Sequence, residues 1–138
     1  MQKVTRFFLI ALVMLLLSAC SNSNSLSVDD VISAFKDAGL EAENPREMTK
    51  DDFGIAPMKS EEGKHITLPS LCEDCGGRIL SYDNNEDLKQ MKAYYNDLGK
   101  ESAMLFSWTI EKDNILVQLN GDLPDEEFEK YKKALMDL

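Results

Sequence analysis

The chain has 138 residues, of which 25 are acidic and 15 basic, and its formal net charge at pH 7 is −10. Nucleic-acid binding needs a basic surface, so this charge balance argues against nucleic acid as a partner. The balance also argues against electrostatic adhesion to an anionic bilayer, while it favours solubility and suits a cationic partner.

The first 20 residues have the layout of an export signal. Lys3 and Arg6 precede an apolar run from Phe7 to Leu17, and small residues then lead to Cys20. As a helix with a rise of about 1.5 Å per residue, this run would cross only about half of a hydrocarbon core of about 30 Å. We therefore expect residues 1–19 to be a signal peptide and not a membrane span.

Leu17-Ser18-Ala19-Cys20 resembles the lipobox of bacterial lipoproteins, whose pattern is Leu-(Ser/Ala)-(Ala/Gly)-Cys. The resemblance implies cleavage before Cys20, acylation of its sulfur, and a protein anchored on the extracytoplasmic face of the cell membrane. The two chains of a diacylglyceryl group would supply the anchor, because one acyl chain binds only marginally. An ordinary secretory signal that happens to end beside a cysteine is the alternative. In size and layout, the chain also resembles small lipoproteins of Gram-positive bacteria, a likeness that implies no particular activity.

Residues 20–27 are expected to form the lipidated cysteine and a flexible tether, because Ser21 to Ser27 is small, polar and aperiodic. Residues 28–138 are expected to form a single domain, since a chain of this length can bury one core. Removing Lys3 and Arg6 with the signal peptide leaves 13 basic against 25 acidic residues, a net charge of −12.

A helix is expected to start at Ser27, whose hydroxyl can cap the amide groups that follow, and to end at Gly39. Leu40 to Glu43 is expected to be a short extended piece. Residues 46–63 are interrupted by Gly and Pro, which predicts an exposed loop with one helical turn capped by Thr49. The apolar face of the first helix would consist of Val28, Val31, Ile32 and Phe35.

From residue 64 the predicted order is strand, strand, helix, and this order occurs twice, over residues 64–98 and 103–138. The strands are expected at 65–68, 77–83, 103–110 and 115–120, and the helices from Asn85 to Leu98 and from Pro124 onward. The two ββα units predict an α+β fold in which the N-terminal helix precedes a four-stranded antiparallel sheet. The helices are expected to pack on one face of that sheet, with the other face partly solvated.

Cys72 and Cys75 are the only thiols that remain once Cys20 carries lipid. A local disulfide or a pair of idle thiols is the interpretation we favour, because the chain is directed to an oxidising compartment. A thiol redox pair is a second interpretation, although the adjacent Glu73 and Asp74 disfavour a thiolate. A zinc or cuprous copper site that adds His65, the one histidine of the chain, is the third.

No other motif of the sequence assembles a nucleophile, base or phosphate loop. We therefore expect a non-enzymatic module without a cofactor, which binds an envelope protein or a small ligand. The alternative is a thiol-based redox protein or a metal-binding protein that uses Cys72 and Cys75.

Overall fold

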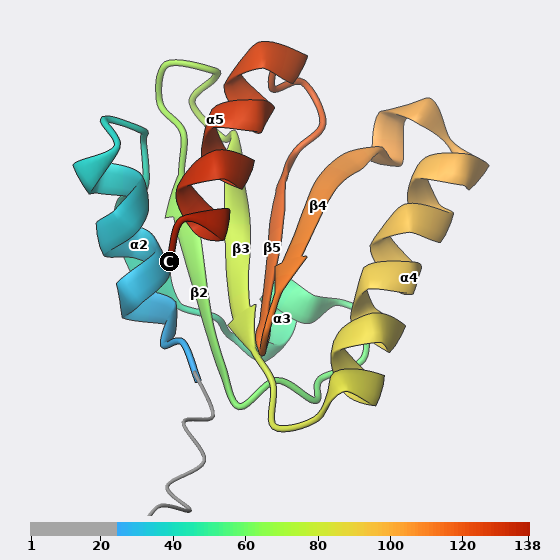
Figure 1. Cartoon of the computed structure of the whole chain (residues 1–138). Helices are drawn as coiled ribbons and strands as arrows, with labels where there is room; N and C mark the ends of the chain where they lie inside the picture. The colour runs from blue at the N-terminus through green and yellow to red at the C-terminus, as the bar shows by residue number, and fades with distance from the viewer. Residues whose placement is uncertain (1–24) are drawn as a thin grey trace, which may run out of the picture.

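A five-stranded antiparallel sheet in the order β1-β2-β3-β5-β4 organises residues 25–138, the part of the chain that the computed structural model describes (Figure 1). The strands are β1 (Glu43–Glu47), β2 (Glu62–Thr67), β3 (Gly76–Ser81), β4 (Ser107–Lys112) and β5 (Ile115–Asn120). The helices are α2 (Val28–Asp37), α3 (Lys50–Phe53), α4 (Asn85–Glu101) and α5 (Asp125–Met136), with one 3-10 turn, η2 (Ala103–Leu105). The α+β class is therefore confirmed. Cys20 and the signal peptide lie outside the described residues.

Helices α2 and α5 cover one face of the sheet (Figure 1). The predicted start of α2 is confirmed, because the Ser27 hydroxyl accepts a hydrogen bond from the Asp30 amide and the Asp30 carboxylate accepts one from the Ser27 amide, both at 3.0 Å. The Phe35 ring meets the Tyr131 ring edge-on at 5.0 Å between centroids. This core includes Val31, Phe35, Ile66, Ile79, Val117, Tyr131 and Leu135.

Helices α3 and α4 lie on the opposite face, so the expectation that all helices share one face is wrong. Leu80 and Leu116 pack there with Phe53, Leu88 and Met91 in a second core. Successive side chains of a strand point to opposite faces, so the apolar pairs Ile79-Leu80 and Leu116-Val117 supply apolar surface to both sides of the central strands.

The sheet has five strands and not four, because β1 pairs with β2 at its edge. All residues of β1 are exposed, and the strand contains Pro45 and three charged residues. Proline and charge are tolerated at an edge strand and suppress pairing with other chains, but they also hide the strand from a search for alternating apolar residues. The register shifts between Glu43 and Arg46, where Asn44 has a positive φ of 47°.

The segment after α4 also differs from its prediction. The helix continues through Gly99 to Glu101, and the expected strand at 103–110 begins only at Ser107, because residues 103–105 form the η2 turn. The turn is capped by the Ser102 hydroxyl, which accepts from the Met104 amide at 3.3 Å. Phe106 lies close to Gly99 and Gly121, since a Cβ on either glycine would meet its atoms.

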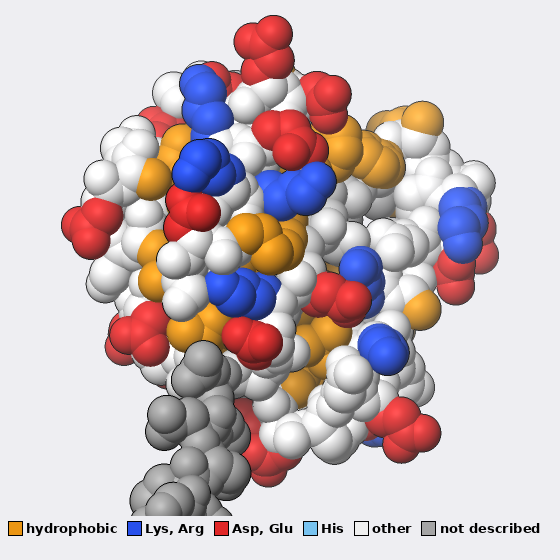
Figure 2. Space-filling view, viewed as in Figure 1, with side chains coloured by type: hydrophobic (Ala, Val, Ile, Leu, Met, Phe, Trp, Pro, Cys, Tyr) orange, Lys and Arg blue, Asp and Glu red, His pale blue; other side chains and the backbone are white. Residues whose placement is uncertain are grey.

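Residues 20–24 of the expected tether lie outside the described residues, and Leu26, near its end, packs against the core under α2 and α5. The face of the molecule drawn in Figure 2, which is the view of Figure 1, carries interspersed acidic and basic side chains with apolar groups between them. None of the helices between residues 25 and 138 combines the length and the apolar character needed to cross a bilayer.

Candidate binding groove

The two cysteines of the β2–β3 loop form a disulfide, Cys72–Cys75. Cys75 is buried and Cys72 is exposed, and the backbone amide of Cys75 donates to the carbonyl of Cys72 at 3.3 Å. Within residues 25–138, no three His, Cys, Asp or Glu side chains are grouped so that they could hold a metal ion. The structure therefore joins the two sulfurs to each other and does not bring His65 to them as a third ligand.

His65 instead belongs to a polar row that crosses the whole sheet on the face of α4. Each of the five strands contributes one polar residue to this row, and the strand register pairs each of these residues with the polar residue of the neighbouring strand. The row continues into α4, because the Thr109 hydroxyl donates to the Asn96 side-chain oxygen at 3.1 Å. In strand order, the row is Arg46, His65, Arg78, Gln118 and Thr109.

Arg78 and Gln118 form the centre of the row, on the central strand β3 and its neighbour β5. The Arg78 Nη1 donates to the Gln118 Oε1 at 2.9 Å, while the Arg78 Nε is buried and has no hydrogen-bond partner. Within residues 25–138, no carboxylate lies within salt-bridge distance of this guanidinium. An arginine that is half-buried, charged and incompletely hydrogen-bonded is costly unless a ligand or water satisfies it.

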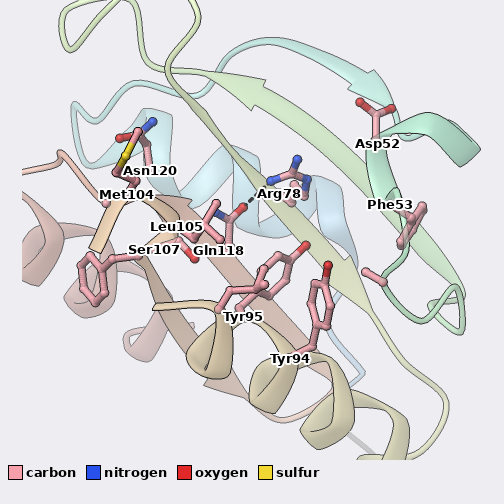
Figure 3. A pocket seen from close by; sticks show the side chains of 14 residues that line it. Asp52, Phe53, Arg78, Tyr94, Tyr95, Met104, Leu105, Ser107, Gln118 and Asn120 are labelled. Carbon is pink, nitrogen blue, oxygen red and sulfur yellow. Dashed lines mark hydrogen bonds between the residues drawn. The ribbon is translucent and has the colours of Figure 1, made fainter. Parts of the chain in front are cut away.

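A groove lies over this pair, because α4 and α3 cover only part of the face. Tyr94 and Tyr95 project into it from α4 and Phe53 lies on its α3 side, so Arg78 and Gln118 form a polar floor between aromatic walls (Figure 3). The cavity has a volume of about 230 Å³, somewhat below the roughly 300–1,000 Å³ of sites for drug-sized ligands. Burial raises the pKa of Tyr95, which keeps its phenol protonated and able to donate.

The rim of the groove beside η2 is apolar and exposed. The relative exposures are 94% for Met104, 51% for Leu105 and 42% for Phe106. All three line the groove together with Ser107 and Asn120. Single exposed apolar side chains are ordinary, but three in succession beside a cavity are typical of a binding surface.

Among the described residues that line the groove, Arg78 is the one cation, and no carboxylate forms a salt bridge with it. Arg46 donates through both terminal nitrogens to the Asp52 carboxylate at 2.8 Å, and the Asp52 carboxylate also accepts from the Thr49 amide at 2.7 Å. These bonds hold the pKa of Asp52 well below its usual range. Burial, and then the nearby Arg46 and Arg78, lower the pKa of His65, so the ring is neutral at pH 7.

The sequence interpretation named His65 only as a possible metal ligand beside Cys72 and Cys75, and it missed Arg78 and Gln118. Each is a single polar residue inside an apolar strand, Gly77-Arg78-Ile79-Leu80 and Leu116-Val117-Gln118-Leu119. Such an interruption was the available signal, since a buried polar side chain needs a partner.

No protein-family model, curated protein or solved structure matches this chain.

Proposed function

We propose that this protein is a lipid-anchored extracytoplasmic lipoprotein whose domain is a non-enzymatic binding module of the cell envelope. Its anchor would be the acylated Cys20, as the resemblance of Leu17 to Cys20 to a lipobox implies. Its binding site would be the groove over Arg78 and Gln118.

The observation that carries the binding role is the half-buried guanidinium of Arg78. The Arg78 side chain lies on the floor of a cavity with aromatic walls, and its hydrogen bond is to the neutral Gln118, so no carboxylate of the described residues pairs with its charge. A cavity with a few convergent polar groups and apolar walls is the usual form of a small-molecule site.

The composition of the groove supports a non-enzymatic role. None of the residues that line it is a histidine or a cysteine, and its one carboxylate, Asp52, is engaged by Arg46. General acid–base catalysis needs a group whose pKa lies near the operating pH. The lining residues offer binding and hydrogen bonding, and they supply no such group.

The binding role is tested by a screen of chemically diverse fragments against the folded domain. Ligand-observed NMR would be run on the wild type and on Ser107→Trp, which places an indole in the groove. We expect a set of fragments that bind the wild type and not the filled variant. If every fragment that binds does so equally to both proteins, the groove is not the binding site.

The anchoring role is tested by Cys20→Ala in cells. Detergent phase partitioning should place the wild type in the detergent phase and the variant in the aqueous phase, because acylation needs the Cys20 sulfur. Ser18→Ala, which keeps the Leu-(Ser/Ala)-(Ala/Gly)-Cys pattern, is the matched control and should partition like the wild type. Equal membrane retention of the Cys20→Ala protein would refute the lipoprotein assignment.

A further inference from the structure

We propose that the groove takes a compact organic carboxylate with an apolar or aromatic body, which binds through its carboxylate to Arg78. The inference rests on the proposed binding role of the groove and names the class of ligand. The carboxylate would lie on the floor formed by Arg78 and Gln118, and the apolar body would pack between Tyr94 and the rim of Met104, Leu105 and Phe106.

The number of charges favours a ligand with a single negative charge. Arg46 is already neutralised by a bidentate pair with Asp52, and His65 is neutral at pH 7, which leaves the guanidinium of Arg78 to meet the ligand. A phosphate monoester carries nearly two charges at neutral pH. One arginine matches a carboxylate in both charge and bidentate geometry.

The hydrogen-bond donors of the floor also suit a carboxylate. Arg78 uses one N–H of Nη1 for Gln118, so the second hydrogen of Nη1 and both hydrogens of Nη2 remain for a ligand, whereas the Nε is buried. Because the oxygen of the Gln118 amide accepts that bond, its NH₂ group is a further donor. The phenol of Tyr95 lies in the same pocket and is kept protonated by burial. Such a set of donors is complementary to the acceptor oxygens of an anion and offers little to a cation.

The aromatic walls of the groove favour a ligand whose body is planar or apolar. Phe53, Tyr94 and Phe106 present rings around the cavity, and aromatic rings stack on planar or apolar groups with a gain beyond simple burial. The rest of the protein is acidic, so a highly charged anion would be repelled by the overall field. A singly charged acid with a large apolar part avoids most of that repulsion and uses both halves of the site.

The test is a titration of the wild-type domain with four probes that share one phenyl group: 3-phenylpropanoate, 3-phenylpropanamide, 2-phenylethylammonium and phenyl phosphate. We expect the carboxylate to bind at least about tenfold more tightly than the amide, because a hydrogen bond to a charged group exceeds a neutral one by about that factor. The Arg78 Nε–Hε and Gln118 NH₂ signals should shift in ¹H–¹⁵N spectra. The Asn114 side-chain NH₂ signal, near the opposite end of β5, should not.

Two variants separate the charge of Arg78 from the overall charge. Arg78→Gln should lose the preference for the carboxylate over the amide while it keeps the weak binding of the phenyl group. Lys36→Gln removes the same charge from an exposed position of α2, on the other face of the sheet, and should keep the preference. Phe106→Ala should weaken all four probes in similar proportion, and it serves as the second variant if Arg78→Gln does not fold.

The outcomes distinguish this inference from the proposed function. If carboxylate and amide bind the groove with equal affinity, or if the ammonium or phosphate probe binds best, the ligand class is wrong and the binding role stands. If no probe shifts the Arg78 signal while fragments of another class are displaced by Ser107→Trp, the ligand class is again wrong. If neither the probes nor the fragments reach the groove, both proposals fail.

The source of the carboxylate is resolved by a second pair of probes. Ala-Ala-Phe with a free carboxyl terminus and the same tripeptide as its amide present the same chemistry at the end of a peptide. Tighter binding of the free tripeptide than of 3-phenylpropanoate would identify a peptide terminus as the ligand, and the reverse order would identify a free small acid. Equal binding of the tripeptide and its amide, together with equal binding of 3-phenylpropanoate and its amide, would contradict a carboxylate ligand altogether.

Discussion

Asn114 holds Leu26 to the domain through both ends of its side-chain amide. The Leu26 N–H donates to the Asn114 Oδ1 at 2.9 Å, and the Asn114 Nδ2 donates to the Leu26 carbonyl at 2.8 Å. The two residues are 88 positions apart in the chain, so this contact fixes the entry of the amino-terminal segment beside the β4–β5 turn.

Asn114→Ala should destabilise the domain by about 1–2 kcal/mol, because two partly buried hydrogen bonds of about 0.5–1.5 kcal/mol each are lost. Asn114→Asp is the matched control, since its carboxylate still accepts from the Leu26 amide and only the donor is lost. Urea unfolding should rank the three proteins as wild type, Asn114→Asp and Asn114→Ala. A wild-type midpoint for Asn114→Ala would show that the contact contributes nothing.

Replacement of both Cys72 and Cys75 with Ala should cost only about 2 kcal/mol, because the disulfide closes a very short loop and its entropic effect grows with the logarithm of loop length. The thermal midpoint of the wild type should not respond to a strong chelator. A midpoint that fell with chelator in the wild type, but not in the double variant, would mean that the cysteines bind metal and that metal binding contributes to folding.

The stability of the domain should fall as the pH drops through about 6.5. Burial and the charges of Arg46 on β1 and Arg78 on β3 lower the pKa of His65, while Asp52 on α3 opposes them. The unfolded chain then binds a proton near pH 6.5 that the folded chain does not, so the contribution of His65 is complete above that pH and is lost below it.

His65→Gln tests this effect, because it removes the titrating group from the row. Urea unfolding midpoints measured at several values between pH 5.5 and pH 7.5, a window around the ordinary His pKa of about 6.5, should slope in the wild type and be flatter in the variant. The lowered pKa values of Asp30, Asp52 and Asp87 affect stability only at lower pH. Identical slopes for both proteins would contradict the role assigned to His65.

Gly121→Ala should destabilise the domain by about 1–3 kcal/mol and deform the rim of the groove, since its Cβ would collide with the backbone carbonyl of Phe106. Gly99→Ala meets Phe106 less closely, with a nearest approach of 3.2 Å to a ring carbon, and gains about 1 kcal/mol of helix propensity within α4. We therefore expect near-wild-type stability for Gly99→Ala. Equal thermal midpoints for the two variants would show that the approach of Phe106 to Gly121 is not tight.

The parts of the fold that sequence predicted well have strong local signals. Ser27 and Gly39 mark both ends of α2, and Thr49 caps the single turn of α3 through Asp52. The hairpins of β2 with β3 and β4 with β5 follow from short apolar segments separated by turn residues.

The parts that sequence did not predict depend on non-local contacts. β1 is a strand because it pairs with the edge of β2, and Glu43 to Glu47 contains no alternating apolar residues that would predict a strand. The groove joins Arg78 to Gln118, 40 positions later in the chain, through a strand pairing that local periodicity cannot specify. To predict that α4 lies on the opposite face of the sheet, one would need to know that Leu80 and Leu116 point away from α2 and α5.

The contact between Leu26 and Asn114 also gives the molecule a polarity. Leu26 is attached at the β4–β5 turn, whereas the η2 turn with Met104 precedes the opposite end of β4 and Asn120 ends β5 there, about 20 Å away for six residues at about 3.3 Å each. If the amino-terminal side of Leu26 is fixed to a surface, the apolar rim is at the distal end of the domain.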